Sequence, residues 1–126
     1  MDHRATILLY LELLFALGVL WREGLFKTRA QRTASVVLVS LAFVFRYCVM
    51  TYETLDYQDW IRVWLNALRE AGPWKGLGQE IWSCNYNVPY LYFLAVIAAS
   101  GIPELLLVKL VSIFFDVMMA WAVMRL

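Results

Sequence analysis

The sequence contains few of the residues that soluble enzymes and metal sites depend on. Charged residues make up 17% of the chain, against about 25% in typical soluble domains. The only histidine is His3, and the two cysteines, Cys48 and Cys84, do not have a metal-binding spacing, so we expect no metal site. Both cysteines fall toward the same face in the topology argued below, which leaves a disulfide and two free thiols as alternatives.

Three further absences exclude whole classes of ligand. The chain has no Walker loop and no glycine pattern of the Rossmann type, so we expect no nucleotide and no other bound cofactor. The net charge is only +1 and no large basic patch is visible, so nucleic acid is not an expected partner.

Hydrophobic residues, by contrast, make up 63% of the chain and are gathered into long runs. Four segments stand out: Ala5–Trp21, Thr33–Met50, Tyr86–Ser100 and Pro103–Leu126. A helix of about 20 residues crosses the ~30 Å hydrocarbon core of a bilayer. The sequence therefore predicts an all-α, multi-pass integral membrane protein with about four transmembrane helices, forming a single unit over residues 1–126, with the lipid bilayer as its first partner.

The loops predict how these segments are oriented. Residues Arg22–Arg32 contain four basic residues and one acid, so this loop is expected to be cytoplasmic. Residues 51–85 then form an outer-face loop, the Gly101-Ile102-Pro103 turn returns the chain from the cytoplasm, and both termini lie outside. Because Glu12 interrupts the first segment, Ala5–Trp21 either spans the bilayer or lies in its interface.

The outer loop contains a second kind of helix. Residues Asp59–Glu70 are predicted to form an amphipathic helix that Gly72 terminates. Trp60 and Trp64 are four residues apart, on the apolar face of that helix beside Leu68. We therefore expect the helix to lie on the membrane surface with both tryptophans toward lipid.

The strongest candidates for chemistry are Asp56 and Asp59, which directly follow the second span. A carboxylate at the boundary between membrane and water can act as a general base, and Arg46 is a candidate for the cation that keeps it ionised. The alternative is structural, with Asp56 capping the surface helix and Asp59 at the third position of a capping box. The two roles do not exclude each other.

Two other polar clusters have alternative interpretations. The stretch Asn85–Tyr92 includes Asn85, Tyr86 and Tyr90, which either anchor the third span in the interface or line a site for a sugar or phosphate group. Lys109, Ser112 and Asp116 share one face of the fourth span. That face is either a polar seam bonded to neighbouring helices, which we favour, or part of a substrate path.

Several of these motifs together resemble the N-terminal part of polytopic glycosyltransferases of the GT-C superfamily, and in particular bacterial relatives of the GPI-type mannosyltransferases. The matching stretches are Phe45-Arg46, Leu55–Trp60, Trp64, Asn85–Tyr92 and Lys109–Asp116. The resemblance implies a bacterial plasma-membrane enzyme that transfers a sugar from a polyprenyl-phosphate donor to an acceptor hydroxyl, with inversion.

The resemblance also implies roles for individual residues. The family's catalytic aspartate corresponds to Asp56, with Asp59 as the second choice. Arg46 and Tyr57 correspond to substrate-binding positions, beside Asn85, Tyr86 and Tyr90.

This chain has fewer spans than members of that family. We therefore expect either the N-terminal portion of a longer enzyme, inactive by itself, or a short form that works with a partner subunit. The alternative function is a non-catalytic small membrane protein that assembles through contacts between helices.

Overall fold

The structure, a computed structural model, describes residues 2–24, 26, 28–79 and 87–126. Within these residues the fold is all-helical, as the sequence predicts. The α-helices are α1 (His3–Glu23), α2 (Arg29–Cys48), α3 (Arg62–Ala71), α4 (Val88–Ala99) and α5 (Glu104–Met124). A π turn, Tyr57–Ile61, precedes α3, and a 3₁₀ turn, Gly76–Gly78, follows it. The chain divides into two compact units, residues 1–51 with 109–126 and residues 52–108.

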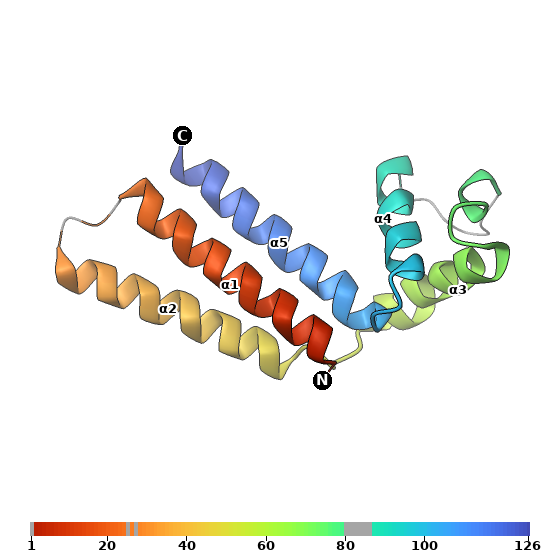
Figure 1. Ribbon diagram of the computed structural model, residues 1–126, viewed down its shortest axis with the longest axis horizontal. Coiled ribbons are helices and arrows are strands. Elements are labelled where there is room, and N and C mark those ends of the chain that lie inside the picture. Colours follow the sequence, from red (N-terminus) through yellow and green to blue (C-terminus); the bar gives the residue numbers. More distant parts are fainter. Residues whose placement is uncertain (1, 25, 27, 80–86) are drawn as a thin grey trace. The chain divides into compact units, whose positions relative to one another are not determined.

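The first unit contains α1, α2 and most of α5, which run side by side (Figure 1). The ends of α1 and α2 have the capping residues that the sequence supplies. Asp2 accepts hydrogen bonds from the backbone N–H groups of Arg4 and Ala5, and Gly24 ends α1 with a positive φ of 60°. Thr28 and Gln31 then form a capping box at the start of α2. Three of the four basic residues expected in a loop, Arg22, Arg29 and Arg32, thus lie in the ends of α1 and α2.

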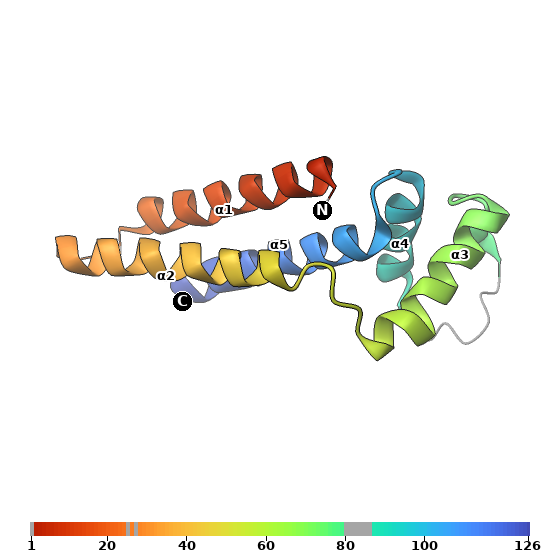
Figure 2. The same ribbon diagram turned by 90° about the horizontal axis from the view of Figure 1, so that it is seen from below.

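One face of α1 is its packing seam. The buried residues Ala5, Leu9, Ala16 and Val19 recur at intervals of four, seven and three residues, which is a single stripe of an α-helix. Glu12 lies in the middle of that interval of seven and therefore on the same stripe. Figure 2, turned relative to Figure 1, shows α1 to one side of both α2 and α5.

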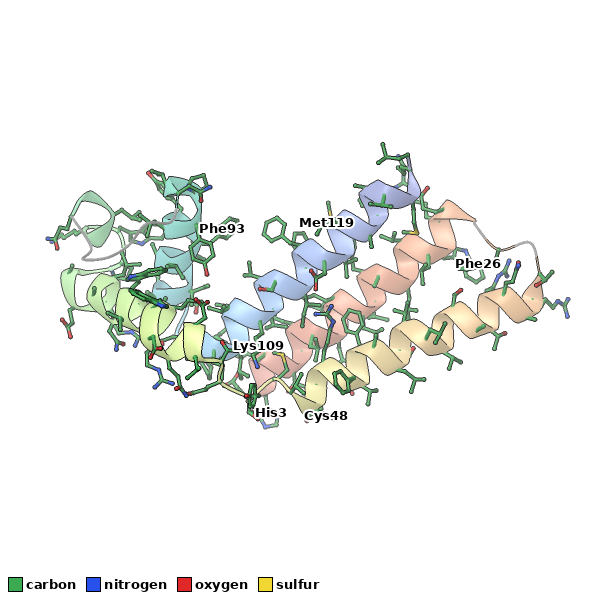
Figure 3. All side chains as sticks on the ribbon, turned by 180° about the vertical axis from the view of Figure 1, so that it is seen from behind. His3, Phe26, Cys48, Phe93, Lys109 and Met119 are labelled. Atoms are coloured by element: carbon green, nitrogen blue, oxygen red, sulfur yellow. The ribbon has the colours of Figure 1, made fainter. Side chains whose placement is uncertain are left out.

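The direction of α5 corrects the expected topology. Lys109, near its start, donates a hydrogen bond of 2.6 Å to the carbonyl of Val49, just after α2. Arg125, at its other end, forms an ion pair of 2.9 Å with Glu23 at the end of α1. Figure 3 accordingly shows Lys109 beside His3 and Cys48. α5 therefore runs parallel to α1, whereas four alternating spans would make the two helices antiparallel.

The third apolar segment forms a short helix. α4 has 12 residues, which at 1.5 Å per residue is about 18 Å, too short for a bilayer of about 30 Å. The chain leaves the first unit after Thr51 and re-enters it at Lys109, at the same end. Among the described helices, α1 and α5 have both the length and the apolar composition to cross a membrane.

The second unit packs α3 against α4 around its own apolar core. Trp64, Leu65 and Leu68 from α3 meet Leu94 and Ile97 from α4, and all five side chains are buried. The expectation that the tryptophans face lipid is therefore wrong for Trp64, which is 1% exposed, because α4 covers that face of α3. Trp60, one turn earlier, is 44% exposed.

Candidate functional site

The candidate site lies at the start of the helical stretch that leads into α3. This stretch begins at Leu55, four residues before the expected start. Thr54 is its cap, because the Thr54 Oγ1 accepts a hydrogen bond of 3.3 Å from the N–H of Tyr57. Asp56 already has helical dihedrals, with φ −58° and ψ −40°. The interpretation of Asp56 as the cap is therefore wrong, and its carboxylate is left for another role.

Asp56 and Asp59 present their side chains to solvent on either side of the buried Tyr57. No described residue forms an ion pair with either carboxylate. The π turn Tyr57–Ile61 has one residue more per hydrogen-bonded ring than an α-helix, and such turns occur often at functional sites. The structure thus places both predicted catalytic carboxylates together on one exposed helix start.

A neighbouring carboxylate, Glu53, is held by two donors. Arg62 forms an ion pair with its Oε2 at 2.5 Å, and the Gln58 side-chain amide donates to the same oxygen at 3.0 Å. The hydrogen bond from Gln58 and then that from Arg62 lower the pKa of Glu53. The Arg62 guanidinium also lies 5.2 Å from the ring centroid of Tyr57, as a cation–π contact. Burial raises the pKa of the Tyr57 hydroxyl.

Glu53, Gln58 and Arg62 are the site residues that sequence reasoning missed. Glu53 precedes the helix in an extended segment, so its nine-residue separation from Arg62 matches no helical spacing. Thr54 could have indicated the earlier helix start, because a threonine followed by helix-forming residues is typical of an N-cap. Had the helix been started at Thr54, Gln58 and Arg62 would share one face, four residues apart.

The pH dependence of this cluster is a testable consequence. Because the pKa of Glu53 is lowered by folding, its contribution to stability is present above the unfolded pKa of about 4.3 and is lost as pH falls through the folded value. We expect amide hydrogen exchange in the π turn to be faster in Glu53→Gln than in the parent at about pH 7. The difference should shrink as the pH is lowered through the folded pKa of Glu53, which lies below the unfolded value of about 4.3. If the difference persisted at the lower pH, the Glu53→Gln substitution would be changing exchange through something other than the loss of the carboxylate charge.

Arg46 has a different partner from the one predicted. Its guanidinium forms an ion pair of 2.7 Å with Asp116 of α5, inside the first unit. The polar face of α5 is therefore bonded to its neighbours, as favoured from the sequence: Asp116 to Arg46, and Lys109 to the Val49 carbonyl. At the far end Glu23 accepts hydrogen bonds from Trp121 and Arg125.

The remaining predicted binding residues divide into two groups. Tyr57 is buried and Tyr90 is half-buried, and both belong to the apolar core of the second unit. Their rings therefore support the helices more than they line an open site. Asn85 and Tyr86 lie outside the described residues, as does Cys84. Cys48 is exposed and is a free thiol.

A groove with a volume of about 310 Å³ lies in the first unit. Its walls are apolar residues of α1, α2 and α5, and the Arg46–Asp116 ion pair is its only charged lining among the described residues. No group of three or more potential metal ligands occurs among the described residues.

No protein-family model, curated protein or solved structure matches this chain. The resemblance to GT-C glycosyltransferases therefore remains an expectation drawn from short motifs.

Proposed function

We propose that this chain is part of a membrane glycosyltransferase in which Asp56 is the general base for transfer of a sugar from a polyprenyl-phosphate donor to an acceptor hydroxyl. The observation that carries the proposal is the state of Asp56. Thr54 caps the helix and Glu53 forms the ion pair with Arg62, so the Asp56 carboxylate is exposed on a helical backbone and has neither of these roles. Asp59 presents a second carboxylate one turn later.

The proposal also places the chain in the plasma membrane as a multi-pass protein. α1 and α5 have 21 residues each and are apolar enough to span; α2 has 20 residues and matches them in length, about 30 Å, but is less apolar. We revise the expected four spans to three, because α4 is short and α5 is parallel to α1. Residues 52–108 then belong to the face opposite the basic turn at Arg22–Arg32, the outer face by the positive-inside rule.

The chemistry requires a base at that boundary. An acceptor hydroxyl loses its proton as the new glycosidic bond forms, and a positioned carboxylate that accepts this proton is worth about 10²–10⁴ in rate. The polyprenyl chain of the donor stays in the hydrocarbon while its sugar reaches the outer aqueous face. A helix start at that face brings the base to where the lipid donor and the polar acceptor meet.

The three-span topology predicts which positions share a side of the membrane. With Cys48 and Cys84 replaced by serine, single cysteines at Thr28 and Leu126 should react with a membrane-impermeant thiol reagent from the same side. A cysteine at Gly78, where an added Cβ meets nothing within 4 Å, should react from the opposite side. If Leu126 and Gly78 reacted from one side and Thr28 from the other, the original four-span topology would be restored.

A second candidate is a non-catalytic membrane protein that assembles with a partner subunit. Ion pairs between the helices favour this candidate. Arg46 pairs with Asp116, and Arg125 pairs with Glu23. Such pairs fix how helices pack without performing chemistry. Loss of sugar transfer in Asp56→Asn would exclude this candidate.

A further inference from the structure

The packing seam of α1 contains one carboxyl group, that of Glu12, with a buried oxygen that receives no hydrogen bond from the described residues. Glu12 lies on the same stripe as Leu9 and Ala16, both buried. Its Oε2 atom is buried, and no described residue donates a hydrogen bond to that atom. This differs from Glu23, further along the same helix, whose Oε1 accepts from Trp121 and Arg125.

The charges around Glu12 do not balance if it is ionised. The charge that acts on Glu12 is that of Arg46 on α2. Arg46 is already bound to Asp116 on α5, through a 2.7 Å contact between its Nη2 and the Asp116 Oδ2. With Glu12 ionised, these three groups from α1, α2 and α5 would carry a net charge of −1, and two of them, Arg46 and Asp116, are 39% and 50% exposed. An unpaired charge within the hydrocarbon depth is strongly unfavourable, so one proton must neutralise the group.

Geometry decides which carboxyl holds that proton. Asp116 accepts a charge-assisted hydrogen bond, which favours its ionised form. Glu12 has one oxygen with no donor, which favours the neutral acid. We propose that Glu12 is a proton-binding site within the three-helix unit, carrying a proton at neutral pH so that the group Glu12, Arg46 and Asp116 has no net charge.

This proposal goes beyond glycosyl transfer and depends only on the placement of α1, α2 and α5 in a bilayer. A neutral carboxylic acid can donate its proton to the interior of the unit and accept it back. An ionised Glu12 would compete with Asp116 for Arg46.

The test is infrared spectroscopy of the full chain in phospholipid vesicles at about pH 7, where exposed glutamates with a pKa of about 4.3 are ionised. We expect a carbonyl band of a protonated carboxylic acid. The band should shift when the protein is made with glutamate labelled isotopically at its side-chain carboxyl. It should disappear in Glu12→Gln, which mimics the neutral acid and should preserve folding, as circular dichroism would check.

Glu23→Gln is the matched control, because it changes the same residue type on the same seam of α1. It should leave the band intact, since Glu23 is ionised and paired. Absence of the band in the parent, a band that labelled glutamate does not shift, or a band that survives Glu12→Gln would overturn the proposal. Alkaline carbonate extraction of the same vesicles separates the two claims. A chain that is washed off overturns the membrane placement, whereas a retained chain without the band overturns only the proton site.

Discussion

Asp56→Asn is expected to reduce sugar transfer by about 10²–10⁴, the usual contribution of a positioned general base. Asparagine keeps the size of the side chain and removes its basicity. The structure separates catalysis from folding at this position, because Thr54 caps the helix and Asp56 is exposed. The variant should therefore insert and bind the lipid-linked donor normally. The measurement is single-turnover transfer from a polyprenyl-phosphate sugar by the protein in phospholipid vesicles.

Asp59→Asn and Glu53→Gln are the matched controls for that experiment. Asp59 is one turn further along the same exposed helix start, so its loss should have a smaller effect. Glu53 is held by Arg62 and Gln58, so its loss should affect the stability of the π turn more than the transfer step. If Asp59→Asn abolished transfer and Asp56→Asn did not, the base would be Asp59. Normal transfer by both variants would leave these carboxylates without a catalytic role.

Trp64→Ala is expected to destabilise the second unit by about 3–5 kcal/mol, the range for truncating a buried large aromatic side chain. Trp64 is 1% exposed and packs in the core that joins α3 to α4. Removal of the indole leaves a cavity that the short helices can fill only partly. Amide hydrogen exchange of the full chain should show the change as exchange that is about 10²–10⁴ faster across α3 and α4.

Trp60→Ala is the control for Trp64, because the two rings are neighbours with centroids 6.3 Å apart. Trp60 is 44% exposed, so its truncation should change exchange by much less, within about 0.5 kcal/mol. Equal effects at the two positions would mean that both tryptophans face the same environment. That result would restore the interpretation of α3 as a helix lying with both rings in lipid.

Much of the local structure of this protein follows from its sequence alone. The capping residues Asp2 and Thr28 begin α1 and α2 because their side-chain oxygens satisfy backbone N–H groups that a helix leaves unpaired. Gly72 ends α3 because its φ of 86° is a backbone conformation that glycine, which has no Cβ, adopts without a steric clash. The apolar runs define the long helices, because backbone hydrogen bonding and burial of apolar surface act over neighbouring residues.

The partners of the polar residues, in contrast, are decided by the tertiary structure. The sequence suggested Arg46 as the cation that keeps Asp56 ionised, but the Arg46 guanidinium binds Asp116, seventy residues further along the chain. Trp64 was expected to face lipid, and α4 covers it. The face of a helix is periodic and can be predicted, but the element that covers the face depends on chain direction. Here the chain leaves the first unit beside Val49 and re-enters it at Lys109, so α5 runs parallel to α1.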